Sequence, residues 1–258
     1  MIPAMATSDD HRLAAELAMR AGVLLLELRQ RLSDEGAPAA TLRDEGDRAA
    51  HDLLMDALAV ARPDDAVLSE EGSAHGVHPD RADASRVWIV DPLDGTREFS
   101  EPPRSDWAVH VALAEDGIPT AGAVALPGLG LTLSTAEPDT TDDLAPVPDV
   151  PRIVVSRTRP PAEALAVAEA LGGLLVEMGS AGAKAMAVVR GEVDVYVHSG
   201  GQYEWDNCAP AAVAASVGLH VSRIDGSPLT YNHPDPYLPD LLICRRELAA
   251  ATLAVVAG

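Results

Sequence analysis

Apolar positions in the first ninety residues predict two helices followed by two strands. Leucine and valine recur at three- and four-residue steps over residues 9–32, which is the pattern of an amphipathic helix. We expect a loop over residues 33–41 and a second helix over residues 47–61. Two short apolar runs, at residues 66–68 and 87–91, predict buried strands on either side of a polar loop.

The next segment alternates with a period of two, which is typical of strands. Trp107 and Leu113 mark one face of a predicted strand over residues 107–115. Two more strands are predicted at residues 120–126 and 129–135, and turn residues separate each strand from the next. The middle of the chain therefore predicts an antiparallel meander.

The second half of the chain alternates between strand and helix patterns. The predicted strands are residues 153–155, 174–176, 193–197 and 241–244. The predicted helices are residues 161–171, 181–190, 206–217 and 248–256. This alternation indicates an α/β layer. We therefore expect a mixed α/β (α+β) fold in two halves, residues 1–150 and 151–258, with the boundary in the Pro-, Asp- and Thr-rich segment 137–151.

Composition limits the core and the compartment. Of 258 residues, 47% are apolar but only 3% are aromatic, so the core must consist of Ala, Val and Leu. The chain has neither an apolar run of about 20 residues nor a signal-peptide pattern. We therefore expect a cytoplasmic protein that does not span a membrane. Cys208 and Cys244 lack metal-type spacing and are expected to be buried thiols, with a single disulfide left open.

The net charge of −21 excludes one class of partner and raises a question about another. A chain this acidic is not expected to bind nucleic acid polymers through their phosphates. An acidic cleft would also repel a small phosphate ester. Bound divalent cations would remove that difficulty, because they invert the sign of the local field.

Candidate chemistry begins where the strand predicted at residues 87–91 ends. The run W-I-V-D-P-L-D-G-T over residues 88–96 places Asp91 and Asp94 three residues apart. Glu70 lies upstream and Asp206 lies far downstream. Carboxylates with no histidine or cysteine among them suit hard cations such as Mg²⁺. The alternative is a strand end with solvated acidic residues.

Gly95 and Thr96 follow these carboxylates directly. Backbone N–H groups at such a turn can receive a phosphate. The combined pattern of carboxylates and a glycine turn indicates metal-assisted hydrolysis of a phosphate ester.

Three segments, Glu70-Glu71, residues 91–96 and Trp205-Asp206, resemble in this order the signature of the inositol monophosphatase-like phosphatases, which are magnesium-dependent and lithium-sensitive. The resemblance covers residues 14–245. It implies a layered α-β-α-β-α sandwich and a small phosphorylated substrate. Homodimers are common in the family, so a homodimer is left open.

The resemblance also implies a ligand set for two Mg²⁺ ions. One ion would be held by Glu70, Asp91 and the backbone oxygen of Leu93. The second would be held by Asp91, Asp94 and Asp206, so that Asp91 bridges both ions. A third, weaker ion near Glu70 is left open.

By the same resemblance, Asp47 and Thr96 would orient the attacking water. Asp47 lies 23 residues before Glu70, a separation like the family's, although the segment leading into it departs from the family pattern. The alignment could therefore slip to Asp44. The alternative for Asp47 is the N-cap of the second helix.

The predicted substrate contacts begin with the metal ligands and the glycine turn. They are Glu70, Leu93, Asp94, Gly95, Thr96 and Asp206. Glu204, next to the last motif, could accept a sugar hydroxyl. His110 and His198 alternate with apolar residues in strands and are predicted to be structural.

Three further residues resemble the branch of the family that acts on 3′-phosphoadenosine 5′-phosphate. Ser180 and Lys184 resemble its Gly-Ser-x-x-x-Lys segment, and Lys184 is the only lysine in the chain. Arg157, after Ser156, resembles its Ser-Arg segment and could reach a second phosphate. The alternatives are a capped helix start for Ser180 and Lys184, and a surface arginine for Arg157.

We therefore expect an enzyme that removes the 3′-phosphate of 3′-phosphoadenosine 5′-phosphate to give AMP and orthophosphate, in the context of sulfate assimilation. A broad phosphatase acting on inositol 1-phosphate or fructose 1,6-bisphosphate is the alternative substrate assignment. An interaction protein that binds metal without catalysis is a different class, and the complete carboxylate set argues against it.

Overall fold

The computed structural model describes residues 6–73, 81–138 and 144–256, which form two five-stranded sheets with helices on both sides of each. The first half contains helices α1 (Ser8–Asp34), α2 (Ala39–Ala61), α3 (Glu70–Ser73) and α4 (Thr96–Phe99) and the 3₁₀ turns η1 (Arg81–Asp83) and η2 (Pro127–Leu129). Its strands are β1 (Ala66–Ser69), β2 (Arg86–Asp94), β3 (Ala108–Glu115), β4 (Ile118–Leu126) and β5 (Leu131–Ser134).

The second half contains strands β6 (Arg152–Ser156), β7 (Leu174–Met178), β8 (Val195–Tyr203), β9 (His220–Ser222) and β10 (Tyr237–Cys244). Its helices are α5 (Ala162–Leu171), α6 (Ala181–Val189), α7 (Glu204–Ser216) and α8 (Arg246–Val256). Strand β9 has no counterpart in the sequence prediction. Most of the polar loop predicted before β2, residues 74–80, lies outside the described residues.

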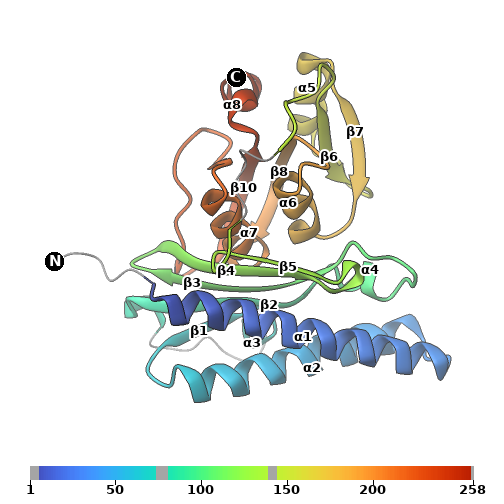
Figure 1. Cartoon of the computed structure of the whole chain (residues 1–258), viewed down its shortest axis with the longest axis vertical. Helices are drawn as coiled ribbons and strands as arrows, with labels where there is room; N and C mark the ends of the chain where they lie inside the picture. Colours follow the sequence, from blue (N-terminus) through green and yellow to red (C-terminus); the bar gives the residue numbers. More distant parts are fainter. Residues whose placement is uncertain (1–5, 74–80, 139–143, 257–258) are drawn as a thin grey trace.

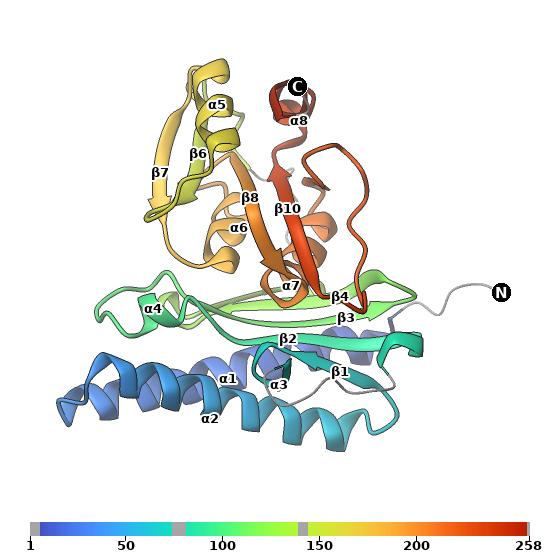
Figure 2. The same ribbon diagram turned by 180° about the vertical axis from the view of Figure 1, so that it is seen from behind.

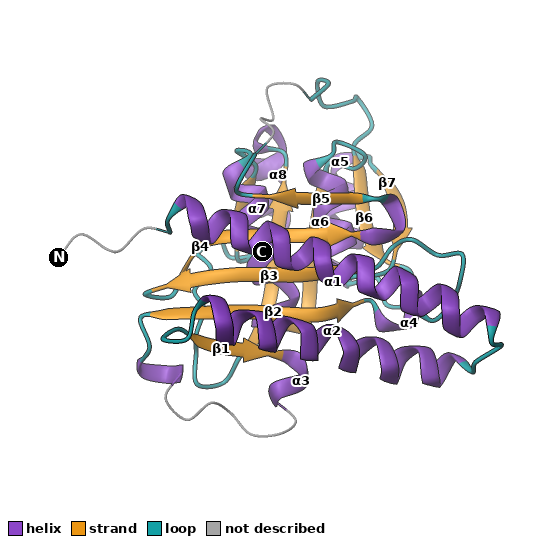
Figure 3. Ribbon diagram, turned by 60° about the horizontal axis from the view of Figure 1, so that its bottom comes forward, coloured by secondary structure: helices purple, strands orange, loops and turns teal. Residues whose placement is uncertain are grey.

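The elements stack as helix, sheet, helix, sheet and helix layers, as the sequence predicted (Figure 1). Helices α1 and α2 cover one face of the first sheet, whose strand order is β1-β2-β3-β4-β5 (Figure 3). Helices α6 and α7 lie between this sheet and the second one (Figure 2). The second sheet has the order β7-β6-β8-β10-β9, and α5 and α8 cover its outer face.

Both faces of β3 are buried, because each packs against a different helix layer. Val109 and Leu113 pack with α1 and α2, whereas Ala108 and Ala112 pack with α6 and α7. The predicted meander is present, since β2, β3, β4 and β5 pair antiparallel in sequence order. Strand β1 pairs parallel to β2, which places Glu70, the residue after β1, at the same edge of the sheet as the end of β2.

The second helix begins eight residues earlier than the sequence predicted. Helix α1 ends at Asp34 and α2 starts at Ala39, so the expected loop over residues 33–41 is reduced to residues 35–38. Leu42 and Gly46 are buried in its added turns. A Cβ at Gly46 would lie 2.8 Å from the Phe99 ring, so glycine lets that ring pack against the helix. These added turns of α2 therefore pack against the core through Leu42 and Gly46.

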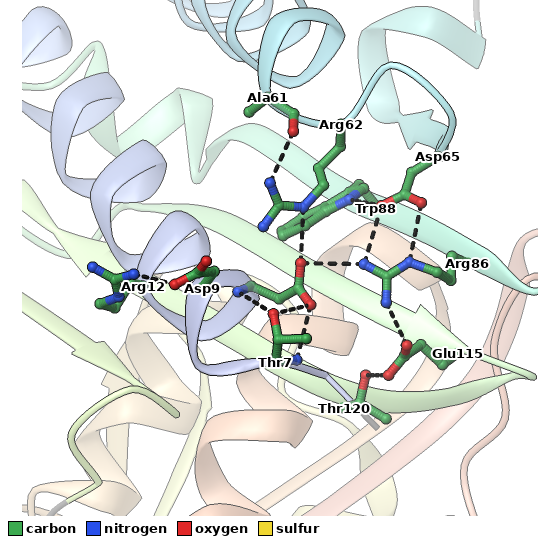
Figure 4. A network of polar contacts seen from close by, with 11 residues as sticks. Thr7, Asp9, Arg12, Ala61, Arg62, Asp65, Arg86, Trp88, Glu115 and Thr120 are labelled. Carbon is green, nitrogen blue, oxygen red and sulfur yellow. Dashed lines mark hydrogen bonds and ion pairs between the residues drawn. The ribbon is translucent and has the colours of Figure 1, made fainter. Parts of the chain in front are cut away.

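A polar network joins the helices to the sheet at the start of β2, the end opposite to Asp91 (Figure 4). Arg86 contacts Asp65, Asp10 and Glu115, with an Arg86 Nε to Asp65 Oδ1 distance of 3.0 Å. Arg62 Nε lies 2.8 Å from Asp10 Oδ1. These ion pairs connect α1, β2, β3 and the turn after α2, and therefore hold the helix layer in register with the strands.

Candidate active site

Three carboxylates converge where β2 ends and α7 begins. Asp91 and Asp94 lie at the end of β2, and Asp206 lies in the first turn of α7. Each offers an oxygen, and these atoms all lie within 4.8 Å of one another. The pairing of β2 with β3 is irregular between Asp91 and Asp94, where Pro92 interrupts the strand. The fold thus brings Asp206 next to Asp91 and Asp94, although it lies more than a hundred positions further along the chain.

Glu70 joins this cluster through Asp91, because the two side chains share a hydrogen bond. Burial and the charge of Asp206 raise the pKa of Glu70 to about 7. Burial and the charges of Glu70 and Asp94 raise the pKa of Asp91 well above its usual range. Burial and the charge of Asp94 raise the pKa of Asp206 to about 6. These carboxylates repel one another when ionised, and a bound divalent cation would compensate their negative charges.

The donor set fits Mg²⁺ or a similar hard cation. Its side-chain ligands are carboxylates, and the backbone carbonyl of Leu93 lies in the same turn. The Leu93 oxygen accepts a hydrogen bond from Thr96 Oγ1 at 3.0 Å, and the Leu93 nitrogen donates to Asp91 Oδ1 at 3.0 Å. These bonds fix the turn between the two ends of the motif.

Asp94 has a second role that the sequence analysis missed, since its carboxylate caps the N-terminus of α6. The backbone nitrogens of Ala181 and Gly182 donate to Asp94 at 3.1 and 2.6 Å, and the Ser180 hydroxyl donates to Asp94 Oδ2. Burial opposes the charge of Asp94, but hydrogen bonds from His110 and Ser180 hold its pKa well below the usual range. The signal in the sequence was the run of small residues after Ser180. Small side chains leave the backbone N–H groups of the first turn of α6 accessible to a capping carboxylate from another part of the chain.

Asp47, in α2, and Thr96, in α4, lie next to each other. Thr96 Oγ1 lies 3.4 Å from Asp47 Oδ1. Burial and the charge of Glu71 raise the pKa of Asp47 to about 7. The N-cap alternative for Asp47 is wrong, because α2 begins at Ala39 and Asp47 lies inside the helix. Asp44 is exposed, which favours Asp47 as the residue that faces the site.

Gly95 connects β2 to α4 in a conformation that favours glycine. Its φ of +83° is left-handed. A Cβ there would lie 3.0 Å from the Cβ of Ser180, so the turn packs closely against the start of α6. This contact brings the residue predicted to bind phosphate next to Ser180.

A cavity of about 500 Å³ adjoins this turn, and four basic side chains are among its lining residues. Its lining residues are Arg97, Glu98, Ser156, Arg157, Thr158, Arg159, Gly179, Ser180 and Lys184. The Arg157 guanidinium lies 2.6 Å from Glu98 Oε1 and 2.9 Å from Glu101 Oε2. Arg157 is therefore held by two acidic residues at the cavity wall, and is not a free surface arginine.

Lys184 is bound to the backbone of the segment before α6. Its side chain is buried and its ammonium donates to the backbone carbonyl oxygens of Gly179, at 3.3 Å, and Ser180. The same ammonium lies 5.4 Å from the centre of the Tyr196 ring. Lys184 thus supports the loop before α6, and its predicted contact with a phosphate remains a prediction.

Glu204 does not have the substrate contact that the sequence analysis proposed for it. It is fully buried, and its carboxylate accepts hydrogen bonds from the backbone nitrogens of Asn232 and His233, both at 2.7 Å. A sugar hydroxyl has no access to a carboxylate held in this way. We therefore leave Glu204 out of the proposed substrate contacts.

The fold and this site define the class of protein. The model of the inositol monophosphatase family matches residues 9–257, and the chain belongs to that family. It is 49% identical to a 3′-phosphoadenosine 5′-phosphate phosphatase of Mycobacterium leprae, over 96% of this chain and 93% of the relative. It is 51% identical to the protein of the same name from Mycobacterium bovis, over 92% and 89%.

Solved structures agree with the layered fold. An inositol monophosphatase from Staphylococcus aureus superposes with a TM-score of 0.75 at 22% identity, covering 94% of this chain and 91% of that one. CysQ from Bacteroides thetaiotaomicron superposes with a TM-score of 0.74 at 25% identity, covering 93% and 98%. The predicted α-β-α-β-α sandwich is therefore confirmed.

The structure also bears on the predictions about the two cysteines and about membrane-spanning helices. Cys208 and Cys244 are buried free thiols, so the disulfide left open in the sequence analysis does not form. Among the helices of the described residues, none combines the length and the apolar character that crossing a bilayer requires.

Proposed function

We propose that this chain is a Mg²⁺-dependent phosphomonoesterase that converts 3′-phosphoadenosine 5′-phosphate and water into AMP and orthophosphate. The observation that carries the proposal is the carboxylate cluster of Asp91, Asp94 and Asp206 beside the Asp47–Thr96 pair. The substrate assignment is supported by the mycobacterial relatives, which match almost the whole chain at about half identity. The link to sulfate assimilation follows from that substrate.

Two cations would share this site. Glu70, Asp91 and the Leu93 carbonyl would hold one, and Asp91, Asp94 and Asp206 would hold the other. When bound, divalent cations polarise the phosphoryl group, stabilise the attacking and leaving oxygens and lower the pKa of water. A third ion near Glu70 stays a prediction. The family's dependence on metal supports the cofactor class, and metal analysis of the purified protein would establish its identity and number.

The side chains of the chain itself position the nucleophile. Thr96 Oγ1 lies between the Leu93 carbonyl and Asp47, so a water beside it can be oriented by both the hydroxyl and the carboxylate. Asp47, with a pKa raised to about 7, can accept the proton of that water near neutral pH. As the water oxygen bonds to phosphorus, the bond to the 3′-oxygen breaks and that oxygen takes up a proton from solvent water.

The second phosphate of the substrate fits the cavity beside α6. Arg157 offers a forked donor there that suits a phosphate, and Ser180 and Lys184 line the same space. The guanidinium already contacts Glu98 and Glu101, so a phosphate would replace the more exposed partner, Glu101. This gives a reason for preferring a bisphosphate over a monophosphate.

A phosphate-release panel with Mg²⁺ tests the proposal. The purified chain is assayed with 3′-phosphoadenosine 5′-phosphate, inositol 1-phosphate and fructose 1,6-bisphosphate. The highest kcat/KM is expected on the nucleotide, and a higher value on either alternative would overturn the substrate assignment. Release from none of the three would favour the interaction-protein hypothesis. The cytoplasmic location and the homodimer remain predictions, and light scattering after gel filtration would test the second.

A further inference from the structure

Two exposed aromatic side chains lie on paired strands next to the start of α7, the helix that carries Asp206. All eight aromatic residues of the chain lie within the described ranges. Six of them are buried, namely Trp88, Phe99, Trp107, Tyr196, Trp205 and Tyr231. Tyr203 and Tyr237 are 46% and 48% exposed. A chain with so few aromatic residues therefore leaves two of them at one place on its surface.

Strand pairing brings these two residues together. Tyr203 ends β8 and Tyr237 begins β10, and the two are directly opposite each other in the antiparallel ladder. The Tyr203 ring stacks on Trp205, with centroids 4.8 Å apart and planes 9° apart. Tyr237 meets Tyr203 edge to face at 6.1 Å. We call Tyr203 and Tyr237 the aromatic platform.

The platform is attached to the candidate metal site through its backbone. The Tyr203 nitrogen donates to Asp206 Oδ2 at 2.6 Å, so the carboxylate that would hold a cation also caps the residue that carries the ring. Gly201 leaves space for the Tyr237 ring, because a Cβ at Gly201 would lie 2.6 Å from that ring. Glycine is thus needed for Tyr237 to lie in this position.

We propose that the aromatic platform binds the purine base of the substrate by stacking, an inference that rests on the proposed nucleotide substrate. If the 3′-phosphate lies beside Asp206, the base is only one ribose away from it. The base is then within reach of the Tyr203 ring. The 5′-phosphate cavity is lined from α4, the segment after β6 and the start of α6, whereas the platform is formed by β8 and β10. The charged and the aromatic ends of a nucleotide therefore have separate places.

Chemistry favours a base over other occupants. The platform offers neutral π faces in a chain of net charge −21, and a purine is the neutral, flat part of the substrate. Stacking on an aromatic side chain is a common way to hold a base, and removing such a ring weakens binding about fivefold or more. A cross-strand tyrosine pair that only stabilised the sheet would have the same effect on every substrate.

The test compares 3′-phosphoadenosine 5′-phosphate with ribose 3,5-bisphosphate, which has both phosphates but no base. Tyr237→Leu and Tyr203→Leu are each expected to raise KM for the nucleotide about fivefold or more, with kcat and the KM for ribose bisphosphate changing less than about twofold. Tyr237→Phe and Tyr203→Phe restore the nucleotide KM, because they keep the ring. Leu174→Ala, at an exposed position on the edge strand β7, serves as the control for loss of surface apolar area.

Equal losses on both substrates would overturn the proposal in favour of a structural role, and an unchanged nucleotide KM in Tyr237→Leu would place the base elsewhere. Thermal midpoints and near-ultraviolet circular dichroism check folding. Should Tyr203→Leu fail to fold, Tyr237→Leu decides the outcome. The proposed function fails separately, if wild-type protein hydrolyses neither bisphosphate. Equal kcat/KM of the wild-type protein on the two bisphosphates would contradict the platform alone.

Discussion

His110 Nε2 lies 3.2 Å from Asp94 Oδ2, inside a completely buried part of the protein. Nδ1 of the same imidazole lies 2.9 Å from the backbone oxygen of Trp205, the residue before Asp206. His110 therefore connects two segments that carry candidate metal ligands. Gly182 makes room for it, because a Cβ there would lie 2.0 Å from His110 Nε2. The sequence analysis assigned this histidine a structural role only.

His110→Leu is expected to weaken Mg²⁺ binding about tenfold or more, because partners that orient ligand carboxylates have effects of this size. The measurement is the Mg²⁺ concentration that gives half of the metal-induced rise in thermal midpoint, which does not depend on turnover. His110→Gln, which can still donate to Asp94, is expected to lose less. Val111→Ala, the next residue on β3, is the control for a packing defect. A His110→Leu variant with an unchanged Mg²⁺ midpoint would contradict the connection.

Asp91→Asn is expected to lower turnover about a hundredfold or more, because Asp91 is the shared ligand of both proposed ions. The same change removes a charge from a buried cluster of carboxylates, so the metal-free variant should unfold at a higher temperature than the metal-free parent. Asp225→Asn, in an exposed turn, is the control for loss of a carboxylate. Activity within tenfold of the parent would refute the bridging role.

The stabilisation by Mg²⁺ should grow with pH. The pKa values of Glu70, about 7, and Asp206, about 6, lie above their usual ranges. Below about pH 4 these groups are protonated in both folded and unfolded chains and contribute nothing to pH dependence. Between pH 4 and pH 7 the unfolded chain loses these protons first, so the metal-free fold becomes less stable as pH rises. The Mg²⁺-induced rise in thermal midpoint is therefore expected to be larger at pH 8 than at pH 5, and an equal rise would count against carboxylate ligation.

Thr96→Ala should lower kcat more than it raises KM. The Thr96 hydroxyl contacts Asp47 and the Leu93 carbonyl, and a group that orients the attacking water acts mainly in the transition state. Thr96→Ser keeps the hydroxyl and should retain most of the activity. Steady-state kinetics on the nucleotide checks both constants. An effect of Thr96→Ala on KM alone would mean that the hydroxyl only binds phosphate.

Arg157 and Lys184 should differ in what they do for substrate choice. Arg157→Ala is expected to raise KM for 3′-phosphoadenosine 5′-phosphate by about tenfold or more, the effect of one lost charged hydrogen bond, and to change inositol 1-phosphate hydrolysis much less. Lys184→Ala is expected to reduce activity on both substrates and to lower the thermal midpoint, because its ammonium supports the Gly179 and Ser180 carbonyls. A selective effect of Lys184→Ala would instead restore its predicted role as a phosphate contact.

The sequence by itself determined the order of most strands and helices along the chain and the ligand-bearing turn, whereas the layered arrangement came from the family resemblance. Strand and helix periods are local properties, so β3 and α1 were predicted close to their true bounds. Asp91, Asp94, Gly95 and Thr96 also form a local unit, because a strand end and a left-handed glycine fix their relative positions. The relative positions of residues that are close in sequence can be predicted without knowledge of the rest of the fold.

Tertiary structure alone decided which distant groups meet. In the turns of α2 that the sequence left out of the helix, Gly46 packs against Phe99, more than fifty residues away in sequence. Asp94 caps α6, and Glu204 binds the backbone at Asn232 rather than a substrate. These contacts satisfy buried polar groups, and each depends on how two sheets and their helices stack. No local pattern encodes such a pairing, because either partner could have been satisfied by water or by another residue until the layers closed.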